Sequence, residues 1–477
     1  MPTRLPPWVM SKFTHLRAIQ RVHQDPSAGR TFRVDRDQFA VFRQHGQSFD
    51  WRTSWRVRFR QHARGLALPG RDEGPKLDAS VNTLLCEDGT DMNPRLVYAD
   101  GVNSPRTAPY DVLSSAGLDG APDVLLGWTV ERHPWLDDPS FRARTMLAGY
   151  GLARAVSEGR VTPLPVRLSA VASMLQSNPP DVAVVTGVRR GSGLAFGSSV
   201  GWGDVLARVA NRLVVEVDDD GDDLGGPAIE GNIVATVPRP ASSGEPPASS
   251  RPADGVDLHI GSLVASLLPN EPTLQFGPGG IGEGIARALD RPLRIWSGLV
   301  TDAMADVHDR GLLLDPVTAT YAWGGEPIRR LASAGMLRLT STTVTHDTTA
   351  LSATPRFIGC NTALQVGLDG AVNVERVGGR VIAAVGGHAD FCLGASRSVG
   401  GMSVIAIRST TGRGESTIVP AVDVVSTSRT DIDVVVTEHG IADLRGVSDT
   451  VRADRLIAIA APQHRDALTE AWKAQGS

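Results

Sequence analysis

Residues 273–289, TLQFGPGGIGEGIARAL, combine three signals that together predict one α/β unit. TLQF has the character of an apolar strand, GPGG is a glycine and proline turn, and IGEGIARAL is typical of a helix. A turn in this position presents backbone N–H groups at a helix N-terminus, where they can hold a phosphate or a developing oxyanion. A purely structural tight turn is the alternative interpretation. The stretch lacks the Lys-Ser/Thr of a P-loop and the spacing of a dinucleotide fingerprint, so it supports neither NTP nor NAD chemistry.

Similar units extend in both directions, with short apolar runs separated by Gly/Pro turns and helical stretches. On the N-terminal side we expect strands at VYADG, APDVLLGWTV, PDVAVVTGV and NRLVVEVDDD, and helices over 144–160 and 161–178 and in GWGDVLARVA. On the C-terminal side a helix is expected at IGSLVASLL, and strands at RIWSGL, TATYAW, TTVT, RFIG, RVIAAV, SVIAIR, DVVVT and LIAIA. This alternation predicts the α/β class.

The chain has 477 residues, which exceeds what one hydrophobic core usually serves, so two domains are expected. Residues 1–70 carry thirteen Lys/Arg against four Asp, within a chain of net charge −4. We interpret residues 1–91 as a basic, poorly ordered extension, with Met92 as a plausible natural start. The Pro/Ser-rich stretch 238–256 is predicted to be a linker between an N-terminal domain, 92–237, and a C-terminal domain, 257–477.

Composition excludes several classes of protein. The apolar runs are far shorter than the ~20 residues that span a bilayer, and no secretory signal is visible, so a cytoplasmic location without membrane association is expected. Three cysteines, Cys86, Cys360 and Cys392, are too few for a disulfide framework or a zinc site, so we expect no metal. A nucleic-acid arm is an alternative for the basic extension, but its lack of helical period favours no nucleic-acid partner.

Three motifs carry a resemblance to a known family. They are LQFGPGGIG at 274–282, GGHADFCLGASRSVGGMSVIAIRST at 386–410 and VVTEHGIADLRG at 435–446. With these motifs, residues 94–472 resemble the acetyl-CoA hydrolase and 4-hydroxybutyrate CoA-transferase family. The resemblance implies two CoA-transferase-like α/β domains packed face to face. It also implies an acyl-CoA and small carboxylates as substrates, no permanently bound cofactor, and a homo-oligomer.

The resemblance implies particular site residues as well. The residues expected to contact coenzyme A are Gly277, Gly279, Gly280, Ile281, Asn361 and Gly387. Pro278 removes one N–H donor from the glycine turn, and a buried turn residue is the alternative for Asn361. The N–H of Gly387 is expected to help form an oxyanion hole. For His388, which follows it, a hydrogen-bonded structural role is the alternative to that of a base. Glu438 and Arg445 are expected to orient loops.

Two positions depart from the family pattern. Aligned through Ile295, Asp302 and Asp306, the family's nucleophilic glutamate falls at Gly298, and the lysine of its GGKS motif falls at Met402. Family transfer proceeds through a glutamyl-CoA thioester, which needs that carboxylate. The acids and bases whose distance from the site the sequence leaves open are Glu326, His346, Asp347 and Asp390.

The sequence therefore predicts an acyl-CoA-processing enzyme, either a CoA-transferase or a thioesterase that acts on a short acyl-CoA. Direct attack by water on the thioester, with His388 or Asp390 as the base, agrees better with Gly298 than transfer does. A catalytically silent relative that binds coenzyme A, or a partner subunit, is the alternative.

Overall fold

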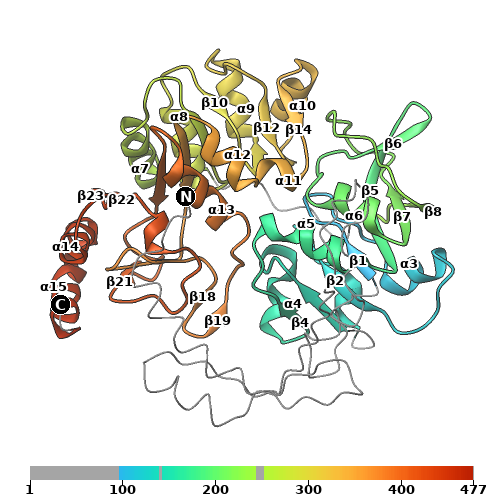
Figure 1. Ribbon diagram of the computed structural model, residues 1–477, viewed down its shortest axis with the longest axis horizontal. Coiled ribbons are helices and arrows are strands. Elements are labelled where there is room, and N and C mark those ends of the chain that lie inside the picture. The colour runs from blue at the N-terminus through green and yellow to red at the C-terminus, as the bar shows by residue number, and fades with distance from the viewer. Residues whose placement is uncertain (1–95, 139–141, 243–251, 476–477) are drawn as a thin grey trace, which may run out of the picture. The chain divides into compact units, whose positions relative to one another are not determined.

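The computed structural model describes residues 96–138, 142–242 and 252–475. The predicted extension 1–91, with Cys86, lies outside the described residues, as do Met92 and residues 243–251 of the predicted linker. Two mainly parallel sheets, each flanked by helices, organise the rest (Figure 1). The predicted α/β class is confirmed.

The first sheet holds eight described strands in the order β4-β3-β2-β1-β5-β7-β8, with β6 paired to β5. All of its pairings are parallel except β5 with β6. The strands are β1 (Leu96–Tyr98), β2 (Asp123–Leu126), β3 (Arg142–Thr145), β4 (Val161–Pro163), β5 (Val182–Arg190), β6 (Gly193–Ala195), β7 (Arg212–Val217) and β8 (Ile233–Pro238). The helices between them are α3 (Pro109–Ser115), η4 (Pro134–Asp137), η5 (Tyr150–Leu152), α4 (Ala153–Ser157), α5 (Leu168–Ser177) and α6 (Gly203–Val209).

Two helices predicted in this half are shorter than expected. The stretch 144–160 begins inside β3 and becomes helical only at η5 and α4, because the backbone at Gly149 has a φ of 120° and interrupts a regular helix. The stretch 161–178 begins with β4, an edge strand that ends at Pro163, before α5 starts at Leu168. Proline fits an edge strand because no ladder N–H is needed on its open side.

The second sheet has six described strands in the order β10-β9-β15-β20-β22-β23, and all are parallel except β23. They are β9 (Thr273–Phe276), β10 (Arg294–Ile295), β15 (Phe357–Asn361), β20 (Met402–Ala406), β22 (Val434–Thr437) and β23 (Gly440–Asp443). Smaller sheets hold β11 (Leu299–Thr301), β12 (Val317–Ala319), β13 (Tyr321–Trp323), β14 (Leu337–Leu339), β16 (Gln365–Gly367), β17 (Val372–Asn373), β18 (Arg376–Val377), β19 (Arg380–Val381) and β21 (Ile418–Val419). The helices are α7 (Gly255–Ser266), α8 (Gly280–Ala288), α9 (Asp302–Asp309), α10 (Glu326–Ser333), α11 (Thr342–Thr345), α12 (Thr348–Ala353), α13 (His388–Arg397), η6 (Arg429–Asp431), α14 (Asp449–Ile459), η7 (Pro462–His464) and α15 (Arg465–Ala474).

Two strand predictions in this half are wrong. TTVT forms α11, and LIAIA forms the end of α14 and the residues after it. In both places a serine caps the helix: Ser341 accepts the N–H of Thr343, and Ser448 accepts the N–H of Val451. These caps satisfy N–H groups that a helix start would leave unpaired, and the local preference of β-branched residues for strands is overridden.

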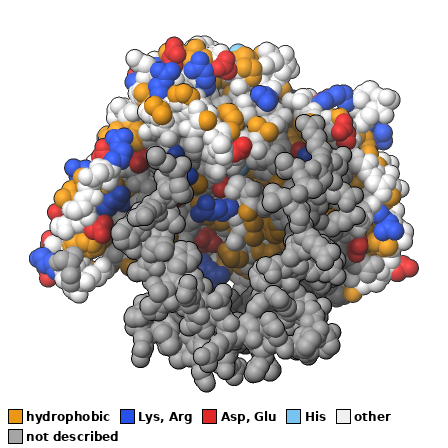
Figure 2. Space-filling model, in the orientation of Figure 1, with side chains coloured by type: hydrophobic (Ala, Val, Ile, Leu, Met, Phe, Trp, Pro, Cys, Tyr) orange, Lys and Arg blue, Asp and Glu red, His pale blue; other side chains and the backbone are white. Residues whose placement is uncertain are grey.

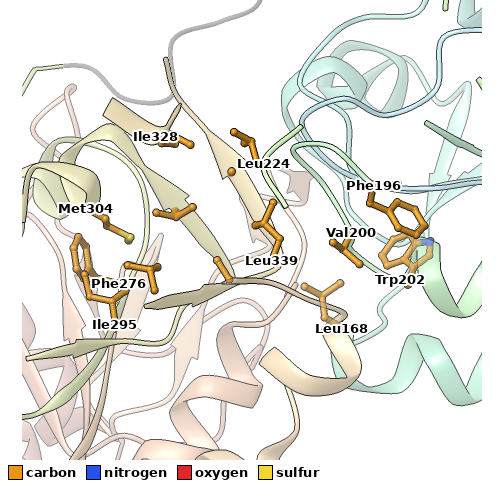
Figure 3. Close-up of a cluster of buried hydrophobic side chains, with 14 of the residues drawn as sticks. Leu168, Phe196, Val200, Trp202, Leu224, Phe276, Ile295, Met304, Ile328 and Leu339 are labelled. Atoms are coloured by element: carbon orange, nitrogen blue, oxygen red, sulfur yellow. The ribbon is translucent and has the colours of Figure 1, made fainter. Parts of the chain in front are cut away.

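The halves share one hydrophobic core. A single cluster of buried side chains includes Phe196 and Trp202 from the first half and Phe276 and Met304 from the second (Figure 3). Polar contacts also cross between the halves, such as the bond from the Ser169 hydroxyl to Asp390. The division into domains at 92–237 and 257–477 stays a prediction, since the packing of these residues is continuous.

Charged side chains of both signs lie interspersed on the face drawn in Figure 2. Exposed ion pairs among the described residues include Arg154 with Glu158 at 2.7 Å and Arg294 with Asp315 at 2.6 Å. Pairs this exposed contribute at most about 1 kcal/mol each to stability.

Candidate active site

Five described strands of the second sheet run parallel and end at the same edge, and the predicted site residues follow three of them. Gly277 comes directly after β9, Gly298 three residues after β10, and Asn361 is the last residue of β15. Ligands in α/β proteins bind at the carboxyl ends of parallel strands. This edge of the second sheet is therefore the candidate active site.

A pocket of about 380 Å³ opens at this edge. It is lined by the glycine turn 277–282, by residues 360–364 and by residues 406–408, 410–412 and 417, with Asp257, Phe276 and Ile285. Five of the six residues expected to contact coenzyme A lie in its wall: Gly277, Gly279, Gly280, Ile281 and Asn361. The sixth, Gly387, is not among the residues that line it.

The glycine turn presents backbone to the pocket. A Cβ added at Gly277 or Gly279 would meet nothing within 4 Å, and Gly279 has a φ of 101° that few other residues adopt. Helix α8 starts directly after Gly279, so its first N–H groups are free of partners within the helix and face the pocket side. Deeper in α8, Gly284 lets α7 approach, because a Cβ there would lie 2.3 Å from the carbonyl oxygen of Asp257. The turn thus borders the pocket on one side and allows close helix packing on the other.

Sequence reasoning missed one cation in the pocket wall. Arg408, two residues after β20, bonds through Nη2 to Asp254 at 2.6 Å and to Asp257 at 2.7 Å. Asp257 is fully buried, so the arginine neutralises a carboxylate beneath the pocket. The arginine does stand in the predicted strand SVIAIR, but nothing in the sequence indicates that it reaches the helix α7.

The amide of Asn361 is held by neighbours inside the protein. Its Oδ1 accepts a bond from Gln275 Nε2 at 3.2 Å, and its Nδ2 lies 3.7 Å from the sulfur of Cys392. The cysteines Cys360 and Cys392 are buried and free, and burial raises the pKa of each thiol to about 12. They are neutral at physiological pH and do not act as nucleophiles there.

A second cluster joins three segments that are far apart in the sequence. A Cβ built on Gly298 would lie 3.4 Å from the imidazole of His346 and 3.5 Å from the ring of Phe391. A Cβ built on Gly387 would lie 2.3 Å from Nε2 of the same histidine. Gly298, Gly387 and His346 therefore surround one small volume, which no periodicity in the sequence indicates.

His388 and Asp390 are both held by hydrogen bonds. Nδ1 of His388 lies 2.8 Å from the hydroxyl of Thr427, and burial lowers the pKa of this histidine to about 4. Asp390 accepts the Ser169 hydroxyl at 2.7 Å and the Ser169 N–H at 3.1 Å, and burial raises its pKa. These contacts favour structural roles for both residues. A catalytic role for either stays a prediction.

Other residues singled out in the sequence have structural contacts. Glu438 accepts the N–H and the hydroxyl of Ser409 at 2.9 and 2.6 Å, which agrees with a loop-orienting role. Asp302 accepts the N–H of Gly325 at 3.0 Å. Met402 is buried at the amino end of β20, while the pocket lies at the carboxyl end, so its side chain belongs to the packing of the sheet.

Arg445 and the remaining acids also have structural contacts. Arg445 pairs with Asp443 at 2.6 Å on the surface. Glu326 bonds to Arg329, and Asp347 caps α12 through the N–H groups of Thr349 and Ala350. Within the described ranges we find no group of three His, Cys, Asp or Glu side chains suited to a metal. In the same ranges no helix combines the length and apolar character needed to cross a bilayer.

Comparison with known proteins places this chain in a family. Residues 328–472 match the family model of the acetyl-CoA hydrolase/transferase C-terminal domain. The butyryl-CoA:acetate CoA-transferase of Anaerostipes caccae is 30% identical over 306 residues, which cover 59% of this chain and 68% of that protein. The 4-hydroxybutyrate coenzyme A transferase of Clostridium kluyveri is 29% identical over 70% of this chain and 82% of its own length.

Solved structures agree. RipA from Yersinia pestis has a TM-score of 0.70 at 25% identity, covering 80% of this chain and 94% of that one. A 4-hydroxybutyrate CoA-transferase from Porphyromonas gingivalis has a TM-score of 0.62 at 24% identity and shares the fold, over 77% of this chain and 97% of its own. The chain belongs to the acetyl-CoA hydrolase/transferase family, as its sequence motifs predicted.

Proposed function

We propose that this chain processes short acyl-CoA thioesters, either by moving coenzyme A between carboxylic acids or by hydrolysing the thioester. The observation that carries the proposal is the pocket at the edge of the second sheet, where the glycine turn, the start of α8 and Asn361 meet. Family membership supports the same substrate class. Coenzyme A enters as part of the substrate, small carboxylates are the acceptors or products, and the proposed location is cytoplasmic.

In this proposal the pocket binds the coenzyme A portion. The N–H groups at the start of α8 suit a phosphate group, because they carry the positive end of the helix dipole. Asn361 is available to the amide groups of the pantetheine arm. Gly387 stands at the N-cap of α13, and its N–H is proposed to hold the developing oxyanion of the thioester.

Hydrolysis agrees better than transfer with the residues around Gly298. The ping-pong route needs a carboxylate that attacks the thioester carbon. Side chains near the α-carbon of Gly298 are the imidazole of His346 and the ring of Phe391, and neither is a carboxylate. We propose that water attacks the thioester directly.

The test is incubation of the full chain with acetyl-CoA, with and without propionate, butyrate or succinate, while every CoA species is followed by chromatography. Free CoA as the only product is expected. A new acyl-CoA would instead establish transfer and an unrecognised nucleophile. No turnover across several acyl-CoAs would favour a catalytically silent relative.

Gly298→Glu separates these outcomes further. A Cβ at this position would meet its neighbours at ordinary contact distances. The variant is expected to fold and to gain transfer with a glutamyl-CoA adduct. Gly298→Gln is the matched control, since it has nearly the same size but no nucleophilic carboxylate. Transfer by the glutamine variant would contradict the proposed role of the position.

A further inference from the structure

The imidazole of His346 is buried, and only one of its two nitrogens has a hydrogen-bond partner among the described residues. The side chain is 1% exposed and follows directly after the short helix α11. Its Nδ1 lies 2.8 Å from Oγ1 of Thr345, while no hydrogen bond to its Nε2 is found among the described residues. This nitrogen is not among the fully buried unpaired atoms of the described residues, so it is open to a ligand or to water.

The hydrogen bonds around Thr345 decide which nitrogen of His346 carries the hydrogen. The carbonyl of Ser341 already accepts two N–H groups, from Val344 at 3.0 Å and from Thr345 at 3.1 Å. Its two lone pairs are therefore engaged, and the Thr345 hydroxyl lies a longer 3.3 Å from it. Its contact with Nδ1 of His346 is shorter, at 2.8 Å, and we assign the hydroxyl as the donor in that contact. With Nδ1 as acceptor, the neutral imidazole carries its hydrogen on Nε2.

A second unpaired donor lies beside this Nε2–H. The N–H of Gly387 has no acceptor among the residues that the structure describes. The two groups are close, because a Cβ added at Gly387 would lie only 2.3 Å from Nε2. The α-carbon of Gly298 borders the same volume, and Phe391 covers the imidazole with a ring-centroid distance of 4.7 Å. Hydrogen-bond donors stabilise an anion in a protein interior, and an apolar wall that excludes water strengthens their effect.

We propose that Nε2–H of His346 and N–H of Gly387 together form the oxyanion hole of this chain. The inference rests on the proposed function and names a second catalytic donor for it. Water attacks the carbonyl carbon of the thioester and loses a proton to solvent, and the carbonyl oxygen becomes an oxyanion held by the two donors. When the carbonyl re-forms, the C–S bond breaks, and the thiolate of coenzyme A takes a proton from solvent.

Burial supports the role of a donor over that of a base. It lowers the pKa of His346 to about 3, so the ring stays neutral throughout the physiological range. A group with so low a pKa is a weak proton acceptor, but as a neutral imidazole it donates a hydrogen bond without bringing a charge into the site.

Two variants separate a donor from a base. In His346→Gln the amide can present an N–H near the position of Nε2, whereas His346→Leu fills the volume without a donor. Loss of an oxyanion donor costs roughly 10²- to 10³-fold in kcat. We expect a loss of that size in the leucine variant, with KM changed much less, and recovery of at least tenfold in the glutamine variant. Equal losses in both folded variants, or no loss in either, would overturn the proposal.

A second measurement does not depend on turnover. In the protein labelled with ¹⁵N-histidine, the His346 nitrogen shifts should indicate a neutral ring protonated on Nε2 from pH 5 to 9. Acetate, used as an anion probe, should shift the Nε2 resonance in the wild type but leave the other histidines unchanged. An unprotonated Nε2, or no response to acetate, would overturn the inference. Absence of turnover alongside the expected shifts would count only against the proposed function.

Discussion

At the scale of single residues, the two glycines beside His346 in the candidate active site differ in the space around them. Gly387 must be glycine, because any side chain would collide with the imidazole of His346. Gly298 has room for a side chain, since its nearest neighbours lie 3.4 to 3.5 Å from an added Cβ. Packing therefore requires glycine at position 387 but not at position 298.

Gly387→Ala should therefore destabilise the protein more than Gly298→Ala does. Overpacking of a buried site typically costs about 1–3 kcal/mol, whereas an alanine that fits its space should change the free energy of unfolding by less than about 1 kcal/mol. Denaturant unfolding of the two variants and the wild type measures both changes. Equal stabilities would show that His346 moves aside without cost.

Asp100 offers a pH-dependent test at the same scale. It accepts bonds from the hydroxyl of Tyr321 and from the N–H of Trp202, and burial raises its pKa from 3.8 to about 7. Between those values the folded chain holds a proton that the unfolded chain has released, so stability falls as the pH rises through this window. Above pH 7 both states are ionised, and this contribution no longer changes.

Asp100→Asn should remove that pH dependence. An asparagine stays neutral and can bond to both neighbours, so the variant should exceed the wild type in stability at pH 8 by on the order of 1–4 kcal/mol. The difference should shrink towards pH 4. Unfolding curves at several pH values check this, and parallel profiles for the two proteins would contradict it.

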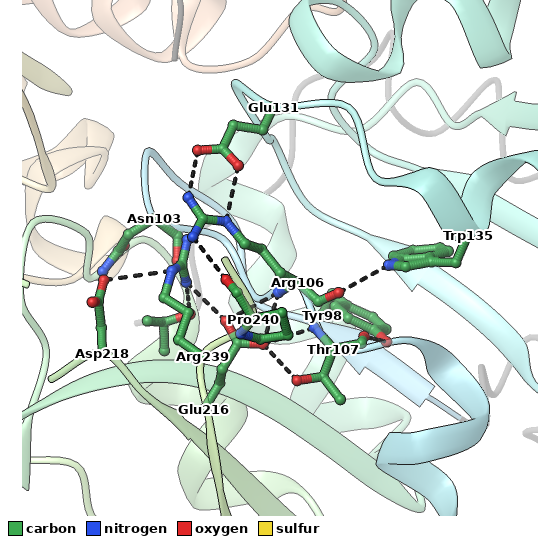
Figure 4. A network of polar contacts seen from close by, with 11 residues as sticks. Tyr98, Asn103, Arg106, Thr107, Glu131, Trp135, Glu216, Asp218, Arg239 and Pro240 are labelled. Carbon is green, nitrogen blue, oxygen red and sulfur yellow. Dashed lines mark hydrogen bonds and ion pairs between the residues drawn. The ribbon is translucent and has the colours of Figure 1, made fainter. Parts of the chain in front are cut away.

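At the scale of secondary-structure elements, a buried charge network holds the loops at the carboxyl edge of the first sheet (Figure 4). Glu216, fully buried in β7, accepts the N–H groups of Arg106 and Thr107 and an N–H of Arg239. Arg239 comes directly after β8, and Arg106 also pairs with Glu131 at 2.6 Å. The network joins the segments after β1, β2 and β8 to β7.

Arg239→Met should destabilise the fold strongly, because it leaves Glu216 buried without its cation. Breaking a buried ion pair costs about 3–5 kcal/mol. Arg189→Met is the matched control in the same sheet, since Arg189 forms an exposed pair with Asp219 whose loss should cost at most about 1 kcal/mol. Thermal or denaturant unfolding measures both, and similar losses would contradict the assignment of the network as structural.

Some parts of this network could be predicted from the local sequence and others could not. The strand β7, which carries Glu216, and the buried strand β5 could both be predicted. Each is a run of apolar residues that can be recognised from its own sequence. The partner Arg239 lies in the stretch predicted as a linker, where proline and serine dominate the composition. No local pattern distinguishes an arginine that folds back onto a sheet from one in a solvated loop.

At the scale of the whole molecule, the halves meet through contacts between segments that are distant in sequence. Asp390, at the start of α13, accepts the N–H and hydroxyl of Ser169, which stands in the first turn of α5. Asp390 therefore caps a helix of the other half. Burial raises the pKa of Asp390, and the two bonds from Ser169 oppose that rise.

A double-mutant cycle of Ser169→Ala and Asp390→Ala should reveal coupling between the halves. Residues that share a hydrogen bond typically show interaction energies of about 0.5–3 kcal/mol. We expect such a value in unfolding experiments, with kcat of the folded variants within a few-fold of the wild type. Additive losses, or a kcat that collapses in Asp390→Ala alone, would instead favour the catalytic role considered for Asp390.

The sequence by itself determined the α/β class, the family and the glycine turn of the pocket, because each depends on residues that are close along the chain. Strand, turn and helix in 273–289 are neighbours, and their order already predicts unpaired backbone N–H groups at the start of a helix. Only the tertiary structure decided the rest of the site. Gly298, His346 and Gly387 are separated by more than forty residues at each step, and chain folding alone brings them together. The imidazole's role depends on burial and on the hydrogen bonds of Thr345, which are properties of the packed interior.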